Sequence, residues 1–152
     1  MALAIAEVRR ALEHDEIVPH FQPLVEIHTG RVMGFEVLAR WTHPDLGLIL
    51  PDKFICLAEK KGLIGELTRQ ILRKVLLIPL LPKPLVVAVN VSPIQLHDLS
   101  LPDQIREAAE TAGFPLERLT IEMTESALAE NLVRAQKIAC TFKSDGLQAR
   151  PG

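Results

Sequence analysis

The pattern of apolar and polar positions divides the first half of the chain into helix-like and strand-like segments. Apolar residues recur at helical spacing in three stretches, the third of which ends before a run of prolines. The predicted helices cover residues 1–14, 52–60 and 64–77. Residues 17–27 and 32–41 read as strands joined by a short glycine-containing turn. We therefore expect the first two strands to form an antiparallel hairpin, followed by a loop over residues 42–51.

The second half alternates buried strands with helices. Residues 85–91 and 119–123 are almost wholly apolar, which is typical of strands buried on both faces in a parallel sheet. Helices are predicted over residues 101–111 and 127–141. This order indicates an α/β fold with parallel crossovers and about four strands. Residues 144–152 show little periodicity, so we expect a frayed end.

Composition limits the classes of function. The 152 residues suit one globular domain, and a net charge of -2 argues against a nucleic-acid partner. Cys56 and Cys140 form no CxxC motif, and we expect both in the core. Prolines interrupt the most apolar window, residues 75–91, so no membrane segment is predicted. The first residues do not resemble a signal peptide, and we expect a cytoplasmic protein.

An acid and a base share one face of the second predicted strand. Side chains alternate along a strand, so Glu36, Leu38 and Arg40 point to one side, whereas Val37 and Ala39 point to the other. Buried charges are costly unless they are paired or bind a metal. The pattern predicts either an internal ion pair or a functional site.

Two more polar residues lie near the carboxyl ends of predicted strands. Asn90 and Glu122 come late in otherwise apolar runs, and in barrel enzymes this edge carries the active site. Together with Glu36 they offer oxygen donors that suit a hard divalent cation, Mg²⁺ or Mn²⁺. Alternatively, Asn90 caps the helical turn near Ser92 and Glu122 is exposed at an edge.

Five motifs, in order, resemble those of the EAL family of cyclic di-GMP phosphodiesterases. The resemblance runs from about residue 12 to about residue 146. The motifs are Phe21-Gln22-Pro23-Leu24-Val25, Glu36-Val37-Leu38-Ala39-Arg40-Trp41, Pro51-Asp52-Lys53-Phe54-Ile55, Asn90-Val91-Ser92 and Glu122-Met123-Thr124-Glu125-Ser126. The resemblance implies a TIM-type (β/α) barrel that hydrolyses cyclic di-GMP to linear pGpG.

The resemblance also implies roles for individual residues. Glu36, Asn90 and Glu122 would be metal ligands for Mg²⁺ or Mn²⁺, and Gln22 and Arg40 would contact the dinucleotide. Two cations would activate the attacking water. Glu125 would be a further site carboxylate. Val37 replaces the alanine of the name-giving motif, but it points away from Glu36, so we expect the change to be tolerated.

The chain departs from the family in length. A complete TIM barrel has eight strands in about 250 residues, and the family's Asp-Asp motif does not follow Gly146. We therefore interpret residues 1–152 as the N-terminal half of an EAL domain, a partial barrel with little or no turnover. The alternatives are a non-catalytic cyclic di-GMP-binding or protein-binding module and a non-functional gene fragment. An open half-barrel would expose a strand edge and an apolar face, which favours self-association.

Overall fold

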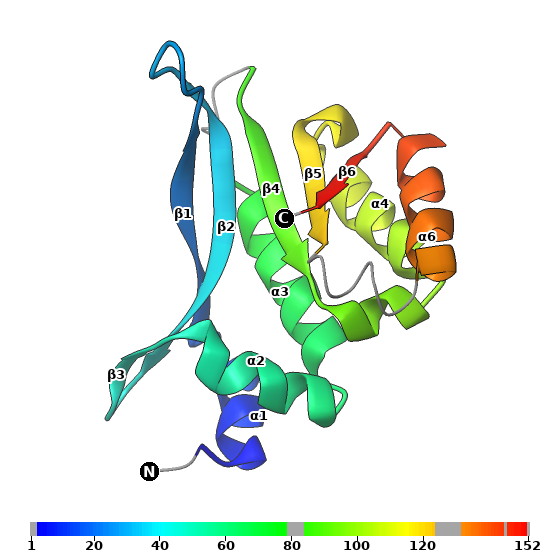
Figure 1. The fold of residues 1–152 in the computed structure, drawn as a ribbon. Coiled ribbons are helices and arrows are strands. Elements are labelled where there is room, and N and C mark those ends of the chain that lie inside the picture. Colours follow the sequence, from blue (N-terminus) through cyan, green and yellow to red (C-terminus); the bar gives the residue numbers. More distant parts are fainter. Residues whose placement is uncertain (1–2, 79–83, 124–131, 145, 152) are drawn as a thin grey trace.

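The computed structural model describes residues 3–78, 84–123, 132–144 and 146–151, which form one sheet with helices packed on one side (Figure 1). The strands follow the order β1-β2-β4-β5-β6, with β3 paired to β2. The strands are β1 (Ile17–Val25), β2 (Val32–His43), β3 (Gly47–Ile49), β4 (Val86–Val91), β5 (Leu119–Met123) and β6 (Gln148–Pro151). The helices are α1 (Ile5–Glu13), α2 (Pro51–Lys60), α3 (Ile64–Leu76), α4 (Leu101–Ala112) and α6 (Leu132–Ser144), with short 3₁₀ turns η1 (Pro93–His97) and η2 (Leu116–Arg118).

The predicted hairpin is present. Strands β1 and β2 pair in antiparallel register from Ile17 opposite Trp41 to Leu24 opposite Gly34. Strand β2 continues to His43 and folds back through a turn to β3, which the sequence did not predict. Gly47 adopts a φ of +72° in that turn, a conformation that glycine accepts without steric cost. The predicted loop is therefore a second, short hairpin.

Parallel crossovers build the rest of the sheet, as predicted. Strand β4 lies beside β2 and pairs with it in parallel, and β5 pairs with β4 in the same direction. The expected frayed end is wrong, because residues 148–151 form β6 along the free edge of β5. The sheet therefore has six strands where about four were predicted. Leu147, 2% exposed, anchors β6 in the core.

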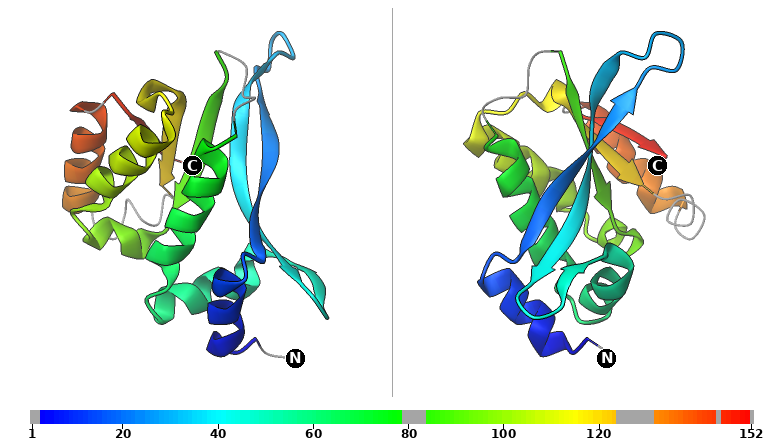
Figure 2. Two further views of the ribbon diagram at one scale, coloured as in Figure 1. Left: turned by 180° about the vertical axis from the view of Figure 1, so that it is seen from behind. Right: turned by 90° about the vertical axis from the view of Figure 1, so that its left-hand side faces the viewer.

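Helices cover one face of the sheet and leave the other open (Figure 2). The covered face supplies the core. Trp41 of β2 is fully buried against Phe54 of α2, with ring centroids 5.9 Å apart in an edge-to-face arrangement. Both cysteines are exposed, contrary to our expectation, because they lie on helix faces turned away from this core. No helix among the described residues is long and apolar enough to cross a membrane.

Candidate functional site

No helix of the described part of the chain packs on the face of β4, β5 and β6 that is turned toward the viewer in Figure 1. The strand register places a set of polar residues on this open face. Strand register aligns Gln22 with Glu36, and it aligns Asn90 with Glu122 and then with Arg150. The polar residues of this face are His20, Gln22, Glu36, Arg40, Asn90, Thr120, Glu122, Gln148 and Arg150. The open face is therefore mixed, whereas an apolar face was expected. Alternation along the strands places Val37, Val89 and Ile121 under the helices and these polar positions on the opposite face.

Glu36 and Asn90 are in direct contact. Nδ2 of Asn90 on β4 donates a hydrogen bond to Oε1 of Glu36 on β2, at 2.8 Å. The two strands can approach because Gly34 has no side chain: a Cβ there would collide with the backbone carbonyl of Val86. The Asn90 side chain is therefore hydrogen-bonded to Glu36 and does not cap the turn that begins at Pro93.

Arg40 shares the face of Glu36, as alternation predicted, but the two do not form the internal ion pair that was the alternative reading. Nη1 of Arg40 donates instead to the backbone carbonyl of Ala39, at 2.9 Å. The guanidinium remains partly exposed on the open face. Gln22, aligned with Glu36 on β1, is exposed as well. Both side chains are accessible to a ligand on this face.

Glu122 is buried, at 6% exposed, and is not the exposed edge residue that the other alternative expected. Its Oε1 accepts hydrogen bonds from Nε of Arg150, at 2.8 Å, and from Nη2 of the same guanidinium. Sequence reasoning missed Arg150 because the tail was interpreted as frayed. The local signal of a strand is the polar–apolar alternation from Leu147 to Arg150, which is too short to identify a strand by itself.

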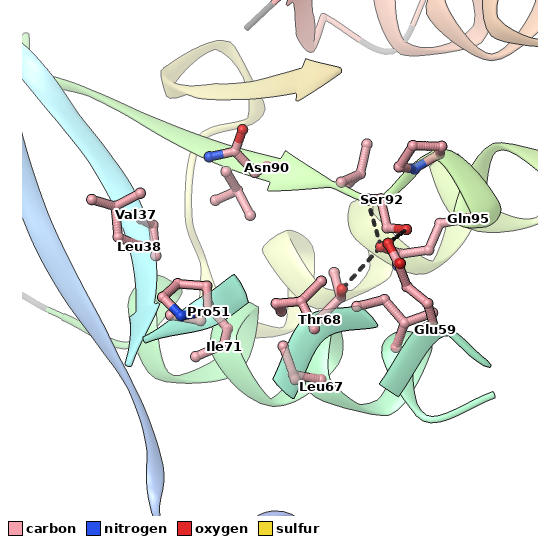
Figure 3. Close-up of a pocket in the computed structure, with 16 residues that line it drawn as sticks. Val37, Leu38, Pro51, Glu59, Leu67, Thr68, Ile71, Asn90, Ser92 and Gln95 are labelled. Carbon is pink, nitrogen blue, oxygen red and sulfur yellow. Dashed lines mark hydrogen bonds between the residues drawn. The ribbon is translucent and has the colours of Figure 1, made fainter. Parts of the chain in front are cut away.

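A cavity of about 300 Å³ adjoins the site between β2, β4 and helices α2 and α3 (Figure 3). Its lining is mostly apolar, with a polar cluster at the end of β4. Oε1 of Gln95 accepts hydrogen bonds from Thr68 Oγ1 at 3.2 Å and from the Ser92 backbone N–H at 3.0 Å, and Ser92 Oγ donates to Glu59. These contacts tie the end of β4, just beyond Asn90, to the helix layer.

The arrangement described does not fit a divalent cation held by Glu36, Asn90 and Glu122. Glu36 and Asn90 lie together, but the Glu122 carboxylate is already bound by a guanidinium. Within the described ranges, no group of three histidine, cysteine, aspartate or glutamate side chains could hold a metal ion. Glu125 lies outside the described residues.

The open face carries donors for an anion beside its two carboxylates. Arg40 and Arg150 offer guanidinium donors, which match the geometry of phosphate oxygens. Gln22 offers both a donor and an acceptor. The face is lined by strands, so these groups are held on a rigid support.

Comparison with known proteins identifies relatives over nearly the whole chain. A family model described as the EAL domain matches residues 5–149. The chain is 40% identical over 131 residues, 83% of its length, to the cyclic di-GMP phosphodiesterase NbdA of Pseudomonas aeruginosa. It is 32% identical, over 96% of its length, to the cyclic di-GMP phosphodiesterase RocR of the same organism.

Among solved structures, the PaMucR phosphodiesterase in complex with c-di-GMP superposes with a TM-score of 0.90 at 31% identity and covers 95% of the chain. The matched region is only part of each relative. It spans 17% of NbdA, 40% of RocR and 61% of the PaMucR chain.

Proposed function

The chain belongs to the EAL domain family, and from this premise we propose that its open face binds cyclic di-GMP, with Gln22 and Arg40 contacting the dinucleotide. The observation that carries the proposal is the register of β1 and β2, in which Gln22 lies opposite Glu36 and Arg40 projects from the same face. The relatives named as cyclic di-GMP phosphodiesterases and the c-di-GMP complex of PaMucR support this ligand.

Hydrolysis is a separate part of the proposal. In the family, Mg²⁺ or Mn²⁺ bound through the positions of Glu36, Asn90 and Glu122 would activate water to cleave the phosphodiester to pGpG. In this chain the Glu122 carboxylate is bound by Arg150. We therefore expect residues 1–152 to bind cyclic di-GMP with little or no turnover.

Isothermal titration calorimetry with cyclic di-GMP tests the binding. Arg40→Ala removes a guanidinium from the open face and should weaken binding about tenfold, equivalent to ~1.4 kcal/mol. Gln22→Ala should weaken it as well. Arg69→Ala is the matched control, since Arg69 is exposed on α3 and the variant loses the same charge. Chromatographic analysis after incubation with Mn²⁺ would detect pGpG.

The outcomes separate binding from catalysis. A folded chain that gives no heat with cyclic di-GMP contradicts the proposal, as does equal weakening by Arg40→Ala and Arg69→Ala. Formation of pGpG that disappears in Glu36→Ala would show that the chain is a phosphodiesterase and that the expected lack of turnover is wrong.

A protein-binding role is the second candidate. Strands β1 and β6 each pair on one side only among the described residues, and an unpaired edge is a template for further pairing. Ile27 at the β1–β2 turn is 94% exposed, and Val25 is 50% exposed. Light scattering across a wide range of protein concentration tests self-association, and a mass that stays monomeric excludes it.

A further inference from the structure

The contact between Glu122 and Arg150 is the part of the open face that the family resemblance does not account for. Both residues lie on paired strands, β5 and β6, and are direct register partners. Two nitrogens of one guanidinium converge on a single oxygen, Oε1 of Glu122. The Glu122 side chain is 8% exposed, whereas that of Arg150 is 46% exposed.

Burial favours a cationic partner for an ionised Glu122. An ionised carboxylate removed from water is strongly disfavoured unless a cation and hydrogen-bond donors replace its hydration. A divalent metal and a guanidinium both meet that need, but a guanidinium bound to the carboxylate repels a second cation beside it. Arginine keeps its charge at any physiological pH, so its competition with the metal is permanent.

We propose that Arg150 is a built-in cation that takes the place of a divalent metal at Glu122, so that the open face recognises a phosphodiester anion without metal. The inference rests on the proposed binding of cyclic di-GMP for the identity of the anion, but the exclusion of metal does not depend on it. The guanidinium has five N–H donors and directs two of them to Glu122. Its exposed side can present the others to a phosphate oxygen.

The second carboxylate of the face differs in a way that supports this assignment. Glu36 accepts a hydrogen bond from Asn90, an amide that carries no charge. Among the described residues, a cation contacts Glu122, whereas Glu36 contacts a neutral amide. Removal of Arg150 would leave two carboxylates and the Asn90 amide on three successive strands, a donor set suited to Mn²⁺ or Mg²⁺.

Mn²⁺ binding, followed by electron paramagnetic resonance of the free ion, tests the exclusion without any nucleotide. Arg150→Met keeps the apolar stem and removes the charge, and Arg150→Ala is a second variant. Both should bind Mn²⁺ about tenfold more tightly than the unmodified chain. Adding Glu122→Gln should abolish the gain. Arg69→Ala loses the same charge from an exposed site on α3 and should bind like the unmodified chain. Circular dichroism identifies the variants that remain folded.

Two results would overturn the inference: tight Mn²⁺ binding by the unmodified chain, or no gain in either folded Arg150 variant. Calorimetry with cyclic di-GMP in a chelator then tests the recognition of the anion. In the chelator, Arg150→Met should bind cyclic di-GMP more weakly than the unmodified chain, and its affinity should rise again when Mn²⁺ replaces the chelator. Equal affinities of the two proteins for cyclic di-GMP in the chelator count against the inference. If cyclic di-GMP fails to bind throughout while the Mn²⁺ results hold, the proposed ligand is wrong and the exclusion of metal stands.

Discussion

The same strands form both faces of the sheet, but the two faces differ in composition. One face packs against the helices and the other is left open. On the covered side lie buried apolar residues such as Val37, Val89 and Ile121. On the open side, one position further along each strand, lie Leu38, Asn90 and Glu122. Strand alternation therefore separates the residues that stabilise the fold from those available for a ligand.

The comparison predicts that substitutions on the covered face have the largest effect on stability. Trp41→Ala removes a fully buried ring and its hydrogen bond from Nε1 to Glu16, 2.8 Å long. We expect a loss of about 3–5 kcal/mol in the free energy of unfolding, measured by urea denaturation. Leu48→Ala is the control, because Leu48 of β3 is 56% exposed and should cost about 0.5 kcal/mol or less. If Trp41→Ala and Leu48→Ala lost similar amounts of stability, burial would not explain the difference expected between the two positions.

A smaller loss of stability is expected from a substitution at the point on the open face where β2 and β4 approach closely. Gly34→Ala places a Cβ against the backbone of Val86 and must push β2 away from β4. We expect a destabilisation of about 1–3 kcal/mol in the same urea assay. Gly65→Ala in α3 meets nothing within 4 Å and should be neutral or stabilising by up to about 1 kcal/mol. If Gly34→Ala were as stable as the original chain, the close approach of the strands would be wrong.

The smallest effect is expected at Asp98, a polar residue of the helix layer that lies away from the open face. Hydrogen bonds from the Ser100 side chain and backbone hold the pKa of Asp98 below its ordinary value of 3.8. Because the pKa is lower in the folded state, ionised Asp98 stabilises the fold above about pH 3.8, and this contribution is lost as the pH falls below that value. Asp98→Asn should therefore be slightly less stable than the original chain at pH 6.

Urea unfolding of the two proteins between pH 6 and pH 3 measures this difference, and it should narrow at the acidic end. A constant difference across the range would mean that the carboxylate is not linked to folding. Asp103→Asn, also at the start of α4, serves as a control for the loss of one negative charge.

Much of the fold was predictable because its elements have strong local patterns. The helical spacing of Leu67, Ile71 and Val75 predicted α3, and the valine-rich run predicted β4. The short strands β3 and β6 were not predictable in this way. Each consists of three or four residues whose extended conformation depends on pairing with β2 or β5. Periodicity over so few residues is too weak to identify a strand.

The site was predictable to the same extent. Alternation placed Glu36 and Arg40 on one face, and the order of the strands predicted that Asn90 and Glu122 would join them. The metal-binding and substrate-binding roles of these residues stay predictions. The partner of Glu122 was not predictable, since Arg150 reaches it only through the pairing of β6 with β5.

By itself the sequence determined the family, the order of the main helices and strands, and which side of each strand is polar, because these depend on residue types and their local spacing. Only the tertiary structure decided which polar groups touch: Asn90 with Glu36, and Arg150 with Glu122. Those contacts depend on strand register and on the close approach of neighbouring strands, which arise from packing across the whole sheet.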